Sequence, residues 1–449
     1  MSKTQTEMNA KAVDEQYLWH GMKPYNPQAT MIVEKAHGAR IQDSDGHEYI
    51  DAMAGLWCVN VGYGREEIAK AAYDQMMKNA YAPLSQSHPP AIQLAEKVNE
   101  LLGGGYVVFF SNSGSEANEV AFKIARQYYA QQGKASKYKI VSRYRAYHGN
   151  SMGSLAATGQ AERKYKYEPL APGFLHVAPP DEYRQPEKAS EPTALPSVQA
   201  VDHVMTWEMG QTIAAMIMEP IITGGGVIVP NEQYMRGIKE VCEKHDALLI
   251  VDEVICGFGR TGKPFGHQHY GVKPDIVTMA KGITSGYLPL SATAVKREIY
   301  EAFNGSEMYD YLRHVNTFGG ATASCAAALK NIELMEQEQL FERSAIKGAE
   351  ILQILQEQLE NHALVGSVRG KGLLIGIELV ENKETKQPVA VQVVNDIIAA
   401  CKQQGVIIGK NGATVAGYNN VLTLSPPLNT SDEDLQTIVD TVVKAIWDK

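Results

Sequence analysis

The sequence predicts an α/β protein, built on a mostly parallel sheet that helices cover on both faces. Short apolar runs alternate with segments of helical length through the middle of the 449-residue chain. Several of these runs are apolar almost throughout, which is typical of parallel strands buried on both faces. The flanking stretches lack this alternation. We therefore predict a large central domain at residues 66–325 and a small α+β domain formed by residues 1–65 and 326–449.

The elements follow in chain order. The first 65 residues are expected to be an irregular lead and then a hairpin with Asp45-Gly46 as its turn. Five strands are predicted for the central sheet: Tyr106–Ser111, Lys137–Arg143, Ala214–Pro220, Leu248–Glu253 and Asp275–Lys281. The segments Glu116–Gln132 and Tyr234–Lys244 have helical length, and Asp181–Leu195 is rich in Pro, Glu and Ser, as surface loops are.

A different order of elements follows Cys325. A helical pattern continues to about Asn361, and Leu373–Val380 then has the composition of a strand. A helix at Val391–Gln404, a strand within Asn420–Pro427 and a last helix complete the chain. This mixture predicts the smaller α+β domain.

Composition argues against several classes of protein. The formal net charge of −9 argues against nucleic-acid binding as the main function. The five cysteines are scattered without a C-x-x-C spacing, which indicates reduced thiols and no thiolate metal site. The first residues are polar, and no apolar run approaches the ~20 residues of a membrane span. We expect a cytoplasmic protein without a signal peptide, a membrane partner or a metal.

The segment Gly257–Gly262 has the letters of the dinucleotide fingerprint G-x-G-x-x-G. That fingerprint requires a strand before it and a helix that begins within it. The strand is predicted, but the following residues hold proline, glycines and no apolar period. The segment therefore does not favour NAD binding. Nearby His267 and His269 form an H-x-H pair without a further ligand at a zinc-like spacing, and we interpret them as loop residues.

Three features point to another cofactor. Asp252 ends one buried strand and Lys281 ends the next, and ligands of open α/β sheets bind beyond the carboxyl ends of strands. Burial lowers the pKa of a lysine and frees its amine as a nucleophile. The small residues of Ser111–Asn118 join a strand to a helix, where free N–H groups can bind a phosphate. Pyridoxal phosphate requires such a lysine, carboxylate and phosphate site. Each signal alone is weak, since Lys281 can be a surface lysine and Asp252 a loop cap.

With these features in place, the chain resembles the class III aminotransferases, which are fold type I pyridoxal-phosphate enzymes, and within them the ω-amine:pyruvate transaminases. The resemblance covers nearly the whole chain. Its markers are Asp45-Gly46 with Tyr49–Asp51, Gly55–Trp57, Ser111–Asn118, Tyr147–Gly149, Glu219-Pro220, Asp252–Gly262, Lys281-Gly282, Thr317–Gly320 and Pro426-Pro427. It implies a large domain with a mostly parallel sheet between helices, a small domain from both ends of the chain, and pyridoxal 5′-phosphate as the cofactor.

The resemblance also assigns catalytic and ring-binding residues. Lys281 forms the Schiff base with the cofactor and moves the substrate proton. Asp252 holds the pyridine nitrogen protonated, which makes the ring an electron sink. Val254 and Tyr147 pack on the two ring faces, and Glu219 either supports the cofactor or is a structural carboxylate.

The remaining assignments concern phosphate and substrate. Ser113, Gly114 and Ser115 bind the phosphate, and Thr317 reaches the phosphate of a neighbouring subunit, which implies a homodimer or a dimer of dimers. His148 belongs to the cofactor site through the Tyr147–Gly149 motif. The expected substrate residues are Trp57, Tyr147, Leu84, Arg163 and Lys410, with Trp19 as a further candidate.

Two departures from the family bear on the substrate. Relatives that act on γ-amino acids carry a glutamate–arginine pair, at positions held here by Gly224 and Thr423. Amine:pyruvate relatives often carry a mobile arginine near the position of Gly409, and this chain has no arginine after Arg369. A substrate carboxylate is therefore expected to meet Arg163 or Lys410.

The sequence thus predicts a transaminase that moves an amino group from an ω-amine or ω-amino acid to pyruvate in two half reactions. One alternative is 7,8-diaminopelargonate synthase, which uses adenosylmethionine and 8-amino-7-oxononanoate. That family usually carries paired tryptophans where this chain has Trp57-Cys58. A second alternative is a pyridoxal-phosphate isomerase or racemase, and a third is a catalytically silent homologue, against which Lys281 and Asp252 argue.

Overall fold

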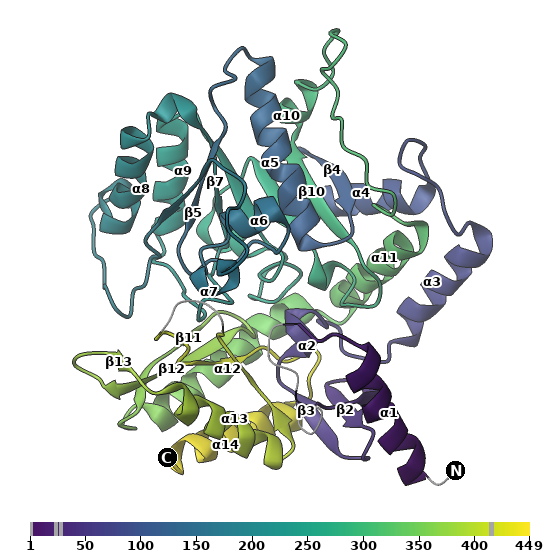
Figure 1. Ribbon diagram of the computed structural model, residues 1–449, viewed down its shortest axis with the longest axis vertical. Helices are drawn as coiled ribbons and strands as arrows, with labels where there is room; N and C mark the ends of the chain where they lie inside the picture. The colour runs from purple at the N-terminus through teal and green to yellow at the C-terminus, as the bar shows by residue number, and fades with distance from the viewer. Residues whose placement is uncertain (1–2, 22–25, 27–29, 413–416) are drawn as a thin grey trace.

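The computed structural model describes residues 3–21, 26, 30–412 and 417–449. A large sheet with its helices forms the upper part of the molecule in Figure 1, and a smaller body lies below it. The smaller body combines the first elements of the chain with the last ones. No helix among the described residues is long and apolar enough to span a membrane.

The central sheet has seven strands in the order β4-β10-β9-β8-β7-β5-β6. Their bounds are β4 Tyr106–Ser111, β10 Ser291–Lys296, β9 Ile276–Met279, β8 Leu248–Asp252, β7 Ile213–Met218, β5 Lys139–Arg143 and β6 Phe174–Val177. β10 is antiparallel to β4 and β9, and the other neighbouring strands are parallel. The predicted α/β class with a mostly parallel sheet is confirmed, and its parallel strands end at one common edge.

Strand β7 illustrates why the central strands are apolar throughout. Met216 and Met218 pack in one cluster with residues of α8 (Pro196–Trp207) and α9 (Tyr234–Lys244). Ala215 and Ile217 pack on the other face with residues of α5 (Gly114–Gln131). Because successive side chains of a strand point to opposite faces, a strand covered on both sides must be apolar at every position.

The other elements of the upper part are short or lie at the edge of the sheet. They are α3 Glu66–Lys78, α4 Pro89–Leu101, α6 Met152–Ala157, α7 Ala161–Lys164, α10 Arg297–Glu301, α11 Thr322–Gln337 and the 3₁₀ helices η1 Pro192–Ala194, η2 Gly210–Thr212, η3 Gly266–Tyr270 and η4 Lys281–Ile283. α11 packs against α3 and α4. The segment predicted as a surface loop at residues 181–195 contains only η1.

The smaller body holds two sheets. The first has the order β1-β2-β3-β14, with β1 Val33–His37, β2 Arg40–Asp43, β3 Glu48–Asp51 and β14 Val406–Ile407. The second has the order β11-β12-β16-β15, with β11 Val365–Gly370, β12 Ile375–Asn382, β16 Val421–Leu424 and β15 Gly409–Lys410, and β13 Gln387–Pro388 pairs with β12. The helices here are α2 Ala54–Trp57, α12 Leu340–Leu359, α13 Val391–Gln403 and α14 Asp432–Trp447. Since β14 pairs with β3, the two ends of the chain share one sheet.

Two predictions of secondary structure were wrong. The lead that was expected to be irregular contains helix α1 (Lys3–Tyr17), whose sequence is rich in good helix formers such as Ala, Glu, Gln and Lys. The helical pattern after Cys325 was taken as one long segment but comprises α11 and α12. Gln339 separates them because its backbone is left-handed, with a φ of 51°. Neither Pro nor Gly stands at this break between the two helices, so the amino-acid composition does not reveal that the helical pattern is interrupted.

The glycine-rich segment after β8 has a structural role that a dinucleotide loop would not have. Arg260 is fully buried, and its guanidinium donates to Leu373 O at 3.0 Å, to Pro426 O at 2.5 Å and to Asn60 Oδ1 at 2.7 Å. Burial lowers the pKa of Arg260 to about 9. One side chain therefore joins the segment after β8 to Asn60 from the early part of the chain and to Leu373 and Pro426 from its late part.

We predict that Arg260→Met destabilises the protein by about 3 kcal/mol or more, because three buried acceptors lose a charged donor. The measurement is the free energy of unfolding in urea. The matched control is Arg297→Met, at an exposed position of α10, which should stay within about 0.5 kcal/mol of the wild type. Equal stabilities of the two variants would contradict this role of Arg260.

Candidate active site

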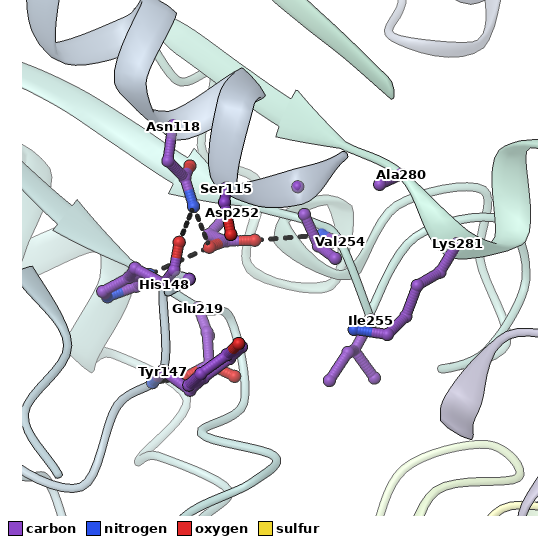
Figure 2. A pocket seen from close by; sticks show the side chains of 12 residues that line it. Ser115, Asn118, Tyr147, His148, Glu219, Asp252, Val254, Ile255, Ala280 and Lys281 are labelled. Atoms are coloured by element: carbon purple, nitrogen blue, oxygen red, sulfur yellow. Dashed lines mark hydrogen bonds and ion pairs between the residues drawn. The ribbon is translucent and has the colours of Figure 1, made fainter. Parts of the chain in front are cut away.

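A pocket opens where β5, β7, β8 and β9 reach the common edge of the sheet. Figure 2 shows Lys281 on one side of it and the group of Asp252, Asn118 and His148 on the other. The pocket is lined by Gly114, Ser115, Asn118, Tyr147, His148, Gly149, Glu219, Asp252, Val254, Ile255, Ala280 and Lys281. The structure thus brings together eight of the residues predicted for the cofactor site: Gly114, Ser115, Tyr147, His148, Glu219, Asp252, Val254 and Lys281.

Asp252 is the last residue of β8, and neighbouring groups fix its carboxylate. Its Oδ2 accepts hydrogen bonds from Asn118 Nδ2 at 2.8 Å and lies 2.9 Å from His148 Nδ1, while Oδ1 accepts from Val254 N at 3.1 Å. The residue is 4% exposed. A carboxylate has about four lone-pair positions, so Oδ1 keeps the capacity to accept one more donor. Asp252 can therefore bind a protonated ring nitrogen.

Lys281 lies two residues beyond β9, at the start of η4, rather than within the predicted strand Asp275–Lys281. Its φ of 42° is left-handed, a conformation that costs energy for a non-glycine residue and is concentrated at functional sites. The amine donates no hydrogen bond to any residue that the structure describes. Burial lowers the pKa of Lys281, which favours the neutral, nucleophilic amine.

The N-terminus of α5 faces the pocket. Gly114 and Ser115 begin this 18-residue helix, whose first N–H groups have no partner within the helix and attract anions. A Cβ at Gly114 would lie 2.9 Å from Val254 Cγ2, so only glycine leaves this approach open. Ser113 caps the helix through Oγ, which accepts from Glu116 N, and it does not line the pocket.

Tyr147 and Glu219 line another wall of the pocket, and hydrogen bonds to the Glu219 carboxylate hold this wall together. Glu219 Oε1 accepts from Tyr147 N and Oε2 accepts from Thr223 N, both at 3.1 Å. Burial raises the pKa of Glu219, which is 4% exposed. Glu219 thus both lines the pocket and holds the turn that follows β7.

Besides Ser113, five residues predicted for phosphate or substrate binding lie outside the pocket lining. Thr317 is exposed, and its carbonyl accepts from Tyr81 Oη. Trp57 packs in a separate apolar cluster with Ile221 and Val227. Each of the other three contacts a neighbouring residue. Leu84 lies beside Gly320, Lys410 Nζ lies 2.7 Å from Asn395 Oδ1, and the guanidinium of Arg163 lies over the Tyr147 ring. Trp19 is 97% exposed.

The sequence assigned no role to two residues that orient the site. Asn118 donates to both Asp252 and the carbonyl of His148, and Thr278 Oγ1 donates to Asn118 Oδ1 at 2.7 Å. One signal was available: Asn118 lies one helical turn after Gly114, on the same face of α5. Thr278 is the register partner of Asp252 on β9, which only the strand pairing reveals.

These groups fit pyridoxal phosphate. A helix N-terminus with a glycine at its closest approach suits the phosphate dianion, and a fixed buried carboxylate suits the ring nitrogen. The amine of Lys281, which makes no hydrogen bond among the described residues, suits the aldehyde.

Comparison with known proteins gives one consistent result. The family model described as aminotransferase class-III matches residues 22–446. An uncharacterized aminotransferase of Bacillus subtilis is 62% identical over 442 residues, covering 98% of this chain and 97% of that protein. A taurine–pyruvate aminotransferase of Bilophila wadsworthia is 42% identical over 437 residues, covering 97% and 96%.

Solved structures agree. A Bacillus anthracis aminotransferase superposes with a TM-score of 0.98 at 59% identity and covers 100% of both chains. An amine transaminase from an uncultivated Pseudomonas species, solved with pyridoxal phosphate bound, has a TM-score of 0.90 at 35% identity and covers 96% of this chain and 98% of its own.

Proposed function

The chain belongs to the class III aminotransferases, which use pyridoxal 5′-phosphate, and on that premise we propose that it transfers an amino group from an ω-amine or ω-amino acid to pyruvate. The observation that carries the proposal is the placement of Lys281, Asp252 and the N-terminus of α5 around one pocket. The similarity to a taurine–pyruvate aminotransferase supports the choice of an ω-amino donor and of pyruvate.

When bound, pyridoxal phosphate supplies an aldehyde that condenses with amines and a pyridinium ring that delocalises the electron pair of a deprotonated carbon. Lys281 removes the proton from the substrate carbon that bears the amino group, and its lowered pKa makes the neutral amine available for this step. Asp252 would hold the proton on the ring nitrogen, and Asn118 and His148 hold Asp252. Tyr147 and Val254 line the pocket and would hold the ring through apolar contact.

The proposed donor class rests on three positions, Gly224, Thr423 and Gly409, at which relatives carry ionisable side chains. Gly224 lies beside Tyr147, where a Cβ would be 3.9 Å from that residue's Cβ, and it brings no carboxylate. Thr423 is fully buried, and a Cβ at Gly409 would lie 2.5 Å from Met53 Cε. The positions at which relatives carry arginines therefore hold the uncharged residues Thr423 and Gly409. A second carboxylate bound there without a partner would lose much by desolvation, whereas an uncharged group loses little.

We predict that an arylalkylamine or taurine with pyruvate gives a kcat/KM at least about tenfold above that of 4-aminobutyrate with 2-oxoglutarate. Steady-state rates of the holoenzyme over a panel of donors and acceptors are the measurement. A preference for the second pair would overturn the argument from Gly224 and Thr423.

The same assays separate the alternatives. Turnover of 8-amino-7-oxononanoate with adenosylmethionine would make the chain a 7,8-diaminopelargonate synthase. Conversion of one amine in the absence of any 2-oxo acid would make it an isomerase or racemase, because those reactions need no second substrate. Strict dependence on pyruvate supports the transaminase.

The active unit is proposed to be a homodimer or a dimer of dimers, since Thr317 lies exposed and away from the pocket of its own chain. Cofactor binding and assembly should then be coupled. Sedimentation of the holoenzyme should give a dimer or tetramer, and a fully active, cofactor-saturated monomer would contradict this.

A further inference from the structure

The turn that carries Lys281 holds two non-glycine residues in the left-handed region of the backbone map. Lys281 has a φ of 42°, and Ser285 has a φ of 49°. Such conformations cost energy for residues with a side chain, and they persist only where the surrounding structure fixes them. The contacts that fix this turn therefore bear on the direction of the Lys281 amine.

Two of these contacts come from one side chain of helix α11. Asn331 Nδ2 donates to the carbonyl oxygens of Gly282 and Ile283, at 2.9 Å and 3.0 Å. Both residues belong to η4, which begins at Lys281 and packs against α11. One side-chain amide thus binds two successive carbonyl groups directly after the lysine and fixes their orientation.

Asn331 is a polar residue in apolar surroundings. It is fully buried, and its buried neighbours on α11 include Ala327, Ala328 and Ile332, which belong to the main apolar cluster. A buried amide destabilises a protein unless it makes hydrogen bonds, and asparagine is a poor helix former. The two bonds to the turn are therefore what this amide contributes.

The segment around Asn60 packs on the same turn. A Cβ at Gly282 would lie 2.6 Å from Asn60 Nδ2 and 3.0 Å from Phe258 Cβ, so this segment meets the glycine directly. Asn60 is itself fixed, since its Nδ2 donates to the carbonyl of Phe258 at 2.8 Å. Packing thus confines the turn at Gly282, and the hydrogen bonds of Asn331 set the direction of its carbonyls.

The conformation of this turn decides where the lysine extends. Lys281 lines the pocket, and Figure 2 shows its side chain on the side opposite the group around Asp252. Its amine donates no hydrogen bond to any described residue, so no polar partner in that part of the chain holds it. The backbone conformation and the packing of the side chain therefore set its direction.

We propose that Asn331 is a positioning residue of the active site: by holding the carbonyls of Gly282 and Ile283, it keeps Lys281 in the left-handed conformation that directs the amine toward the cofactor aldehyde. The inference rests on the proposed function, in which Lys281 reacts with that aldehyde. Asn331 lies outside the pocket lining and acts only through the turn. Loss of its amide should change how fast Lys281 reacts, not how well the rest of the pocket binds.

The test measures these two quantities separately in the full-length apoenzyme. Pyridoxal 5′-phosphate is added, and borohydride reduces the C=N bond that forms, which fixes the cofactor to the reacting lysine for peptide mapping. 4′-Deoxypyridoxine 5′-phosphate carries a methyl group in place of the aldehyde, so its affinity reports on the pocket without the lysine. Asn331→Leu and Asn331→Asp remove the N–H donor at nearly constant size. Both should slow capture at Lys281 by about tenfold or more and leave the affinity for the analogue within about twofold.

Holoenzyme kinetics give a second readout. With 2-phenylethylamine as donor, kcat and the kcat/KM for pyruvate should fall together by about tenfold or more, with KM little changed. This pattern is expected because the lysine is misplaced while substrate binding is intact.

Asn420→Leu is the matched control. Asn420 is also fully buried, its Nδ2 donates to the carbonyl of Leu379 at 2.6 Å, and its Oδ1, like that of Asn331, has no partner among the described residues. It belongs to the smaller body and lies outside the pocket lining. Thermal unfolding should show that both Asn→Leu variants are destabilised, but only Asn331→Leu should slow capture.

Normal capture in either Asn331 variant would overturn the proposal, as would equal slowing in Asn420→Leu. Loss of analogue binding in both Asn331 variants would also overturn it, because Asn331 would then hold the whole pocket rather than the lysine. Fixation of the wild-type cofactor to another lysine would overturn both the role of Lys281 and this inference. Because the capture assay contains no donor and no 2-oxo acid, absence of pyruvate-dependent turnover in the wild type would overturn the transaminase assignment alone.

Discussion

Replacing Lys281 with alanine is expected to reduce kcat/KM by about 10⁴-fold or more, because the variant loses both the nucleophile and the proton-transfer group. Lys281 lies just beyond the end of β9 and lines the pocket, and burial lowers the pKa of its amine. The measurement is the rate of amine-to-pyruvate transfer, together with borohydride reduction of the wild-type holoenzyme and mapping of the modified lysine. Cofactor fixed to another lysine would show that the assignment is wrong.

A matched control distinguishes chemistry from burial. Lys137 is also buried and its pKa is also lowered by burial, but its Nζ donates to the carbonyl of His245 at 3.0 Å, away from the pocket. Lys137→Ala should lower stability and leave the turnover of folded enzyme nearly unchanged. An equal loss of turnover in both variants would mean that misfolding, not missing chemistry, explains the effect at Lys281.

The second large effect is expected for Asp252→Asn. The substitution keeps the shape but removes the charge. One carboxylate oxygen becomes an NH₂ group, which would face a donor, either Asn118 Nδ2 or Val254 N, and could not accept from it. We expect kcat to fall by about 10²–10³-fold or more, which corresponds to several kcal/mol for a lost preorganised charge. Steady-state rates and the absorption spectrum of the bound cofactor are the measurements.

Asp275→Asn is the control for this variant. Asp275 is a buried carboxylate at the opposite end of β9, where it pairs with Lys239 at 2.9 Å and Lys296 at 2.7 Å. Its loss should destabilise the fold but spare kcat. Near-normal turnover of Asp252→Asn would remove Asp252 from the mechanism.

The family resemblance and the chemistry of the cofactor were evident from the sequence because their signals are local. An apolar run such as Leu248–Val251 predicts a doubly covered strand, and polar residues at its end predict a site at the sheet edge. Lys281 and Asp252 could be identified in this way, since a buried charge stands out in an apolar context. The break at Gln339 could not, because its left-handed backbone depends on how α12 packs.

The positions of the candidate substrate and phosphate residues depended on the tertiary structure. Arg163 and Lys410 were equivalent candidates for a substrate carboxylate in the sequence, and Thr317 was the candidate for the phosphate of a neighbouring subunit. The fold directs Arg163 over Tyr147 and Lys410 toward Asn395, and it leaves Thr317 exposed. Thr278, which is neutral, gave no signal until the pairing of β8 with β9 placed it beside Asp252. Asn118 gave only the weak signal of its position one helical turn after Gly114. The sequence by itself determined five of the seven strands of the central sheet and indicated Lys281 and Asp252 as candidate site residues, because periodicity and burial are properties of neighbouring residues. Only the tertiary structure decided which of the predicted residues line the pocket, because the direction of a side chain is set by contacts with residues distant in the chain.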